Sequence, residues 1–345
     1  MRIIAEKDFE NFVNGLIARD DREVVGVQSR NSHYVFDDLE DAKDLALDYD
    51  VTILPPKKYL MPQTEAILEY EKKKGDFSME PLLEVEPRII IGIHPYDLIA
   101  IQQMDKVFSD TYEDEYYLDR RKECILIGAN MQNVSDRSFA ASMGTATTDS
   151  GYDLMLTDLG DKYAVEIGSS KGSDLLENAK TRNASSEEVE KVEEVKRRVK
   201  EKFEKELEFS PKELPTLLDQ NYENMNFWEE NSETCYSCGT CNLVCPTCYC
   251  FDVEDVNEIT MDSGKRVRRW DGCLLEGFAV VAGGENFRDN RAERYRHRYM
   301  RKGKYIYDRY GDIACVGCGR CASQCIPDIA DPCRVYNDMK EMEAE

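Results

Sequence analysis

The hydrophobic pattern in the first half of the chain predicts strands and helices in alternation. Residues 88–93 and 124–128 are compact apolar runs rich in β-branched side chains, which is typical of buried strands. Residues 96–101 begin a helix between them, so this stretch is expected to form a βαβ unit with a right-handed crossover. A further helix is expected at residues 8–17, and further strands at residues 22–27, 34–36, 152–158 and 162–166. We therefore assign residues 1–171 to a mixed α/β domain.

The polar pattern changes in residues 172–215. Ser185 and Glu188 form a capping-box pattern, which predicts the start of a helix. Charged residues then surround a narrow apolar seam made of Val189, Val192, Val195, Val199 and Phe203. This pattern predicts a long surface helix that packs on its own domain, with a coiled coil to a partner as the alternative. Pro211 and Pro215 end the pattern, so residues 172–215 are interpreted as a charged helix and linker.

Composition narrows the class of protein. The 345 residues are 41% hydrophobic and carry a formal net charge of −24. This acidity disfavours nucleic acid as a general partner, because phosphate binding needs clustered Lys and Arg. No apolar run is long enough to cross a bilayer, and the first residues show no secretory signal pattern. We therefore expect a cytoplasmic protein with no membrane span.

The cysteines carry the strongest signal. One of the 13 cysteines, Cys124, precedes residue 235, and the rest lie between Cys235 and Cys333. In a reducing compartment such patterned cysteines indicate metal ligands or redox chemistry before disulfides. Two runs share the spacing C-x-x-C-x-x-C-x-x-x-C, and they consist of Cys235, Cys238, Cys241 and Cys245, then Cys315, Cys318, Cys321 and Cys325. This spacing lets a tight loop surround three corners of an iron–sulfur cube. Gly239 and Gly319 would supply the positive φ and the close backbone approach that such a loop needs.

Two complete runs predict two [4Fe–4S] clusters. In two-cluster ferredoxins the fourth cysteine of each run binds the other cluster. We therefore expect one cluster on Cys235, Cys238, Cys241 and Cys325, and a second on Cys315, Cys318, Cys321 and Cys245. A structural zinc protein is the alternative, although zinc sites normally use two separated cysteine pairs. The proline after the second run comes one residue later than after the first, at Pro327, which should shift a helix start without removing a ligand.

The segment between the two runs is about 70 residues long. Such a separation predicts a long helical insert, as in the α-helical type of two-cluster ferredoxin domain rather than the compact bacterial type. Residues 216–345 are therefore assigned to an α-helical ferredoxin domain, and the whole chain to the α+β class.

The remaining candidate residues have less specific patterns. We expect Cys248, Cys250, Cys273 and Cys333 to act as small buried side chains, with contacts that tune a cluster as the alternative. The three histidines, at positions 33, 94 and 297, are expected to be packed or solvated rather than catalytic. The basic run at residues 288–304 is interpreted as a docking surface or a cover over a cluster, and otherwise as a solvated helix face.

Several motifs together resemble a known family. They are the segment 235–251 with its CYSCGTCNLVCPTCYCF sequence, Trp270-Asp271, residues 282–288, Arg296-His297-Arg298 and residues 315–321. This set resembles the beta subunit of cytosolic sulfhydrogenases, which are NiFe hydrogenases linked to NAD(P), and the A subunit of anaerobic sulfite reductase. Gly92-x-x-Pro95-x-Asp97 and residues 142–145 extend the resemblance to most of the chain. The resemblance implies a subunit that relays single electrons between a flavin subunit, which handles a nicotinamide cofactor, and the hydrogenase or reductase subunits with the terminal active site.

One departure from that family concerns the N-terminal region. Many relatives carry extra cysteines there, but here Tyr96 follows Pro95, and Ser138-Phe139-Ala140 stands where relatives often show Cys-Phe-Cys. We therefore predict an N-terminal domain without a cluster. The alternative function is a catalytic subunit that binds flavin or substrate in this domain. The overall acidity is expected to lower the reduction potentials, because reduction adds negative charge.

Overall fold

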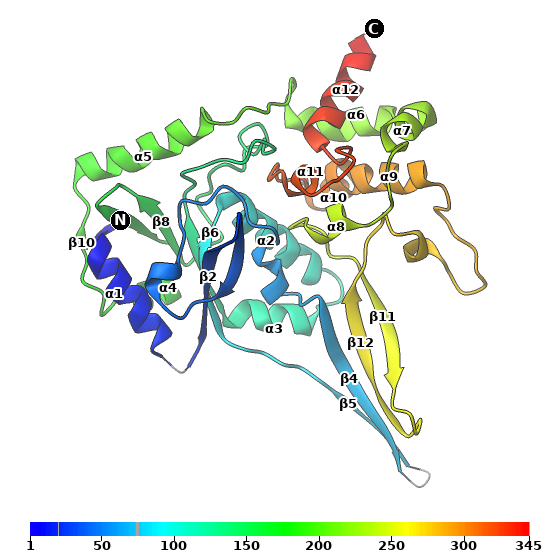
Figure 1. The fold of residues 1–345 in the computed structure, drawn as a ribbon, viewed down its shortest axis with the longest axis horizontal. Helices are drawn as coiled ribbons and strands as arrows, with labels where there is room; N and C mark the ends of the chain where they lie inside the picture. The colour runs from blue at the N-terminus through cyan, green and yellow to red at the C-terminus, as the bar shows by residue number, and fades with distance from the viewer. Residues whose placement is uncertain (20, 74–75, 345) are drawn as a thin grey trace.

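The computed structural model describes residues 1–19, 21–73 and 76–344. An eight-stranded sheet forms the centre of its N-terminal region, in the strand order β10-β1-β9-β8-β7-β6-β2-β3 (Figure 1). Its strands are β1 (Arg2–Ala5), β2 (Glu23–Arg30), β3 (His33–Asp38), β6 (Arg88–Ile93), β7 (Cys124–Ala129), β8 (Leu154–Asp158), β9 (Lys162–Ile167) and β10 (Arg182–Asn183). The four strands β2, β6, β7 and β8 pair in parallel, and the other pairs are antiparallel. The predicted mixed α/β region is therefore confirmed.

Helices cover both faces of this sheet because side chains alternate along buried strands. On one face, α1 (Glu6–Ile17) packs Phe9 and Val13 against a layer that includes Ile89 and Ile125. On the other face, α2 (Pro95–Phe108) and α3 (Glu115–Glu123) pack against a layer that includes Leu126. The expected strand–helix–strand unit is the stretch from β6 through α2 and α3 to β7.

The charged segment forms the expected long helix. After the short α4 (Ser170–Leu175), α5 (Ser186–Lys200) begins at a complete capping box between Ser185 and Glu188. Val192 is fully buried and packs with Ile3 and Ala164 of the large sheet. The helix therefore packs on its own sheet, as the first of the two sequence-based interpretations proposed.

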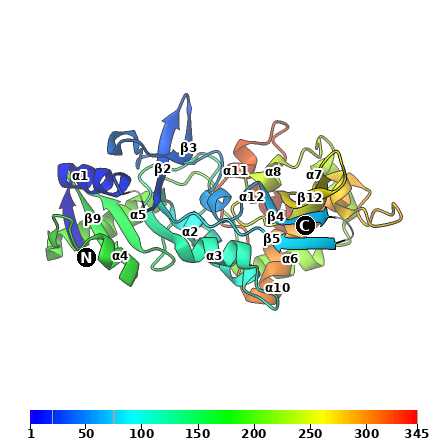
Figure 2. The same ribbon diagram turned by 90° about the horizontal axis from the view of Figure 1, so that it is seen from below.

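A second sheet, which we call the arm, projects from the body of the molecule in Figure 1 and is seen from below in Figure 2. Its strand order is β11-β12-β4-β5, and its strands are β4 (Thr64–Lys73), β5 (Asp76–Pro81), β11 (Phe251–Asn257) and β12 (Ser263–Trp270). The prediction of a continuous helical insert between the cysteine runs was wrong for residues 251–270. These residues form an antiparallel hairpin because β12 pairs with β4, almost 200 residues earlier in the chain.

The C-terminal region is helical. Its larger helices are α6 (Leu214–Gln220), α7 (Met225–Ser232), α9 (Arg291–Met300) and α12 (Pro332–Ala344). They share an apolar core that includes Leu218, Trp228, Tyr299 and Tyr336. The shorter elements of the chain are η1 (Ala42–Asp44), η2 (Pro56–Tyr59), η3 (Pro211–Glu213), α8 (Thr240–Leu243), η4 (Glu276–Ala279), η5 (Arg301–Tyr305), α10 (Ile306–Tyr310) and α11 (Arg320–Ser323). The expected α+β class, with a helical C-terminal region, is confirmed.

One wide helical turn interrupts the basic run. The segment η5 between α9 and α10 is a π-helix. Gly303 lies against α6 so closely that a Cβ there would come 2.3 Å from a side-chain atom of Leu218. The carbonyl of Lys302 accepts a hydrogen bond from the backbone N–H of Cys315 at 3.1 Å. This turn therefore ties the basic helix to the second cysteine run.

Among the described residues, no helix has the length and apolar character that crossing a membrane requires.

Candidate iron–sulfur centre

The two cysteine runs fold into loops of the same kind. Gly239 and Gly319 precede α8 and α11, with φ of +72° and +80°. Both therefore adopt the left-handed backbone that glycine accommodates best. Each short helix contains the third cysteine of its run, and Cys245 and Cys325 follow the helices. The helix of each run therefore begins one residue before the third cysteine and ends before the fourth, so the helix start expected near the proline after the fourth cysteine was wrong.

The fourth cysteine of the first run lies beside the second run. Cys245 lines a small, partly open cavity together with Cys315, Cys318 and Cys321. We call these four the second cysteine group. Phe139, Pro246, Arg298, Lys302, Val316, Gly317, Gly319 and Pro332 complete the lining.

The fourth cysteine of the second run lies beside the first run. Cys325 packs against an apolar cluster that contains Cys235 and Cys241. With Cys238, whose side chain is exposed, these residues make up the first cysteine group. Cys321 packs against the same apolar cluster, so the two groups are neighbours.

The second cysteine loop is fastened to the N-terminal region by buried hydrogen bonds. The Arg320 guanidinium donates to both carboxylate oxygens of Asp97 at 2.7 Å, and to Thr52 at 2.8 Å. The carbonyl of Gly317 accepts from the Ser138 hydroxyl at 2.9 Å and from the backbone N–H of Phe139 at 2.8 Å. The loop is therefore positioned by residues that lie more than 170 positions earlier in the chain.

These contacts involve Tyr96, Ser138 and Ala140, the positions at which the resemblance led us to expect cysteines. Tyr96 and Ala140 pack in one apolar cluster with Val316 and Cys318, and Ser138 donates to Gly317 as described. These three residues thus lie together against the second cysteine loop. In this chain they supply an aromatic ring, a hydroxyl and a methyl group to that contact.

Three of the four additional cysteines lie near the groups. Asn242 of α8 donates through its side-chain amide towards the sulfurs of Cys248 at 3.7 Å and Cys273 at 3.4 Å. A hydrogen bond from Cys248 and the charge of Lys302 lower the pKa of Cys245. Cys250 is partly buried, and the charge of its thiolate contributes to raising the pKa of Cys273, after burial itself. Cys248 and Cys273 are therefore buried, as expected of small packed side chains. They are also hydrogen-bonded by Asn242, as expected of contacts that tune a cluster.

The fourth additional cysteine belongs to the apolar core of the C-terminal helices, against which Cys315 also packs. Cys333 of α12 is buried, and its thiol donates to the carbonyl of Glu206 at 3.3 Å.

The basic run is largely a cover rather than an exposed surface. Arg294, Arg298 and Lys302 are buried, and the last two line the cavity of the second cysteine group. The Lys302 ammonium donates to the Thr247 hydroxyl at 2.8 Å. Sequence reasoning did not single out these two cations. Their spacing of four residues, which places two side chains on one helix face, was the available signal.

Two histidines are packed and one is exposed to solvent, in line with the expectation of packed or solvated histidines. His94 is fully buried, stacks on Tyr49 with ring centroids 3.8 Å apart, and contacts the Tyr96 hydroxyl through Nδ1 at 2.8 Å. Burial lowers the pKa of His94 well below its usual value. His297 is partly buried among arginines, and His33 is exposed.

The cysteine groups fit iron–sulfur clusters in donor chemistry and in charge. Burial raises the pKa of Cys241 and Cys318 to about 12, so bare thiols there would stay protonated and neutral. Two nitrogens of Arg298, Nε and Nη1, are buried and have no hydrogen-bond partner in the described structure. An anionic group held by cysteine thiolates beside Arg298 would satisfy these donors. Within the described residues, no three His, Cys, Asp or Glu side chains are grouped as they would be around a single metal ion.

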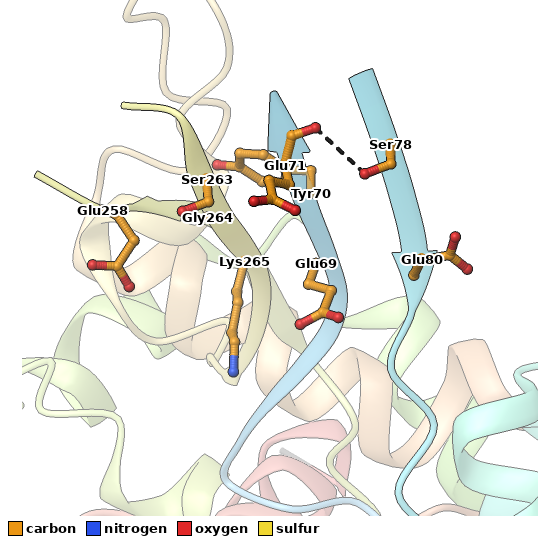
Figure 3. A pocket seen from close by; sticks show the side chains of 9 residues that line it. All are labelled: Glu69, Tyr70, Glu71, Ser78, Glu80, Glu258, Ser263, Gly264 and Lys265. Atoms are coloured by element: carbon orange, nitrogen blue, oxygen red, sulfur yellow. Dashed lines mark hydrogen bonds between the residues drawn. The ribbon is translucent and has the colours of Figure 1, made fainter. Parts of the chain in front are cut away.

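A separate hollow lies on the arm (Figure 3). The described residues that line it include Glu69, Glu80 and Glu258 with Lys265, and no cysteine. It is therefore not part of the cysteine site.

Comparison with known proteins agrees with this site. The family model of a 4Fe-4S dicluster domain matches residues 234–329, which span both cysteine runs. The fold and site thus define an iron–sulfur protein with a 4Fe-4S dicluster domain in its helical C-terminal region. The chain is also 32% identical over 338 residues to sulfhydrogenase 2 subunit beta of Pyrococcus furiosus, covering 96% of each chain. It belongs to the family of sulfhydrogenase beta subunits. No solved structure matches the chain.

Proposed function

We propose that this chain is the electron-relay subunit of a cytoplasmic oxidoreductase complex of the sulfhydrogenase type. It would hold two [4Fe–4S] clusters, one on Cys235, Cys238, Cys241 and Cys325, and one on Cys315, Cys318, Cys321 and Cys245. When bound, such clusters supply reversible uptake of one electron each. The observation that carries the proposal is the exchange of the fourth cysteines between the runs, because it places the two groups next to each other.

The protein residues around the groups support a relay. The N-terminal region and the basic helix enclose the second cysteine group, whereas Cys238 of the first group is exposed. One group thus faces solvent or a partner and the other is shielded, which suits passage of electrons from a surface into an assembly. We propose a flavin subunit that oxidises NAD(P)H on one side, and hydrogenase or reductase subunits on the other.

The division of the chain is also a proposal. We place the α/β domain at residues 1–171, the charged helix and linker at 172–215, and the ferredoxin domain at 216–345. The arm and the Asp97–Arg320 pair join the first and last of these parts.

The relay is tested in the complex purified with its partner subunits. Rapid mixing with NADH or NADPH should reduce the clusters, seen by EPR, before the terminal acceptor is reduced. A Cys318→Ala variant should keep nicotinamide oxidation by the flavin but slow transfer to the terminal acceptor at least tenfold. An unchanged transfer rate in a variant that has lost one cluster would contradict the relay. Flavin bound by the isolated chain would instead favour a catalytic N-terminal domain.

A further inference from the structure

The helix that covers the second cysteine group places two cations against it. Arg298 of α9 and Lys302 of η5 are separated by four residues, and both line the cavity with Cys245, Cys315, Cys318 and Cys321. Their exposed fractions are 2% and 6%. Two long charged side chains have therefore been removed from water at one place.

These cations have no carboxylate partner among the described residues. Neither Arg298 nor Lys302 forms an ion pair there, although Arg320 nearby is paired with Asp97. Lys302 donates to the neutral Thr247 hydroxyl, and Arg298 leaves Nε and Nη1 without acceptors. An isolated buried charge is costly, so such groups are normally paired. The cysteine groups are the anionic partners that the fold offers.

Electrostatics around the two cations agrees with this pairing. Burial lowers the pKa of Lys302, but the thiolate charges of Cys245 and Cys248 outweigh it and raise that pKa overall. For Arg298, burial is likewise outweighed by the negative charge that Cys241 and Cys321 would carry as cluster ligands, which raises the pKa of Arg298. Arg298 therefore lies near both groups, whereas Lys302 lies near Cys245 and Cys248.

The first cysteine group has different surroundings. The open hollow beside Cys235 is lined by Arg291 and Arg294, but also by the carboxylates of Glu229, Glu233, Glu276 and Asp289. Arg294 donates to the carbonyls of Arg288 and Asp289 and to the Ser237 hydroxyl. Arg294 is itself buried, but four carboxylates line the hollow beside it, whereas no described carboxylate lines the cavity of the second cysteine group.

We propose that Arg298 and Lys302 are the counter-cations of the cluster held by the second cysteine group, and that they make it the higher-potential cluster of the two. This inference rests on the proposed function, because it assumes a cluster in each group. Each cluster takes one electron from an external reductant such as dithionite or a reduced flavin. No bond is made or broken, and the cluster gains one negative charge. A nearby cation stabilises that reduced state and raises the potential.

Two opposing effects decide the order of the potentials. Burial of the second group disfavours the more negative reduced state, which alone would lower its potential. The same low dielectric strengthens the attraction of a cation in contact with the cluster. Because the two cations have no competing carboxylate, their field acts on the cluster, and we infer that it exceeds the effect of burial.

The test is an EPR-monitored redox titration of the anaerobically purified full chain. Cys238→Ser alters a ligand of the first cluster only. The reduction step that changes in this variant therefore belongs to the first cluster, and the other step belongs to the second. Lys302→Met removes one cation, and Lys304→Met is its matched control. Lys304 is two residues away and pairs with Asp219 and Asp308 at the surface. Arg298→Gln and Arg298→Lys compare loss of the second cation with retention of its charge.

We expect the Cys238→Ser change to fall on the lower-potential step. Lys302→Met should move the higher step to more negative potential and leave the lower one in place, while Lys304→Met moves neither. Arg298→Gln should lower the higher step as well, and Arg298→Lys should restore part of that shift.

The inference is overturned if Lys302→Met shifts neither step or shifts the lower step alone. If Lys302→Met does not load its second cluster, the order of the two reduction potentials in the wild-type chain is the test. A first cluster with the higher potential in the wild-type chain overturns the inference. Wild-type chain without iron and sulfide would contradict the proposed function itself, whereas a loaded chain with unshifted steps contradicts this inference alone.

Discussion

At the scale of single residues, local charge matters more for the cysteine site than the net charge of −24. The expectation that acidity lowers both reduction potentials treats the net charge as if it acted equally at every point of the molecule. Surface carboxylates act through water and salt, which screen them beyond about 10 Å. Arg298 and Lys302 are buried beside the thiols and are not screened in this way. Sequence spacing identified the eight cysteines, but in a run rich in Arg and Lys it could not show which cations are buried.

His297 provides a residue-scale prediction about pH. Burial, and then the charges of Arg288, Arg301 and Arg296, lower its pKa to about 4, against about 6.5 in an unfolded chain. Between these values the unfolded state binds a proton that the folded state does not, so folding stability decreases as pH falls through this window. The urea midpoint of the wild type should therefore fall more between pH 7 and pH 5 than that of His297→Gln. His33→Gln, at an exposed site, should follow the wild type. Parallel profiles for all three proteins would show that His297 is not held neutral.

At the scale of elements, the predictions succeeded where the signal is local. The apolar runs at β6 and β7 and the capping box of α5 each lie within a few residues of the element that they specify. The arm was missed because β5 and β11 are exposed along their whole length, so no buried apolar run marks them in the sequence. Its sheet depends on pairing between β4 and β12, which no local pattern shows.

The base of the arm depends on one buried carboxylate. Glu65 of β4 accepts hydrogen bonds from Arg268 of β12 at 2.6 and 2.8 Å and from Arg120 of α3 at 2.5 Å. Glu65→Gln should leave the buried Arg120 guanidinium without a charged partner and Arg268 with Asp114 alone, and should reduce the free energy of unfolding by about 3–5 kcal/mol. Glu69→Gln, exposed on the same strand, should change it by less than about 0.5 kcal/mol. Denaturant titration measures both, and equal losses would refute the role given to Glu65.

At the scale of the whole molecule, the cysteine site depends on both regions of the chain. The Asp97–Arg320 pair and the contacts of Gly317 attach the second cysteine loop to the N-terminal region. The sequence motifs predicted the family, which the comparisons confirm, and they are the basis for the proposed cysteine ligands, because both rest on short segments. They could not predict that Tyr96, Ser138 and Ala140 would meet this loop, because that contact joins residues far apart in the chain.

Gly319 tests this attachment. Its φ is +80°, and a Cβ would lie 2.6 Å from the carbonyl carbon of Arg137, so alanine would strain the backbone and press on the N-terminal region. Gly311 is the control, with φ of +77° and no atom within 4 Å of its Cβ position. Gly311→Ala should cost about 1–2 kcal/mol of folding stability, from the backbone conformation alone. Gly319→Ala should cost more and should also lower the iron content. Equal stability losses with full iron in both variants would show that the loop does not need this close contact.

The central claim is that eight cysteines hold two [4Fe–4S] clusters. Its most direct test is the content of iron, acid-labile sulfide and zinc in anaerobically purified chain, with EPR after dithionite reduction. We expect about eight iron and eight sulfide per chain, with a signal from two interacting reduced clusters. Cys245→Ser should lose about half of the iron, while Cys248→Ser keeps it. Zinc without sulfide, or about twelve iron per chain, would contradict the account.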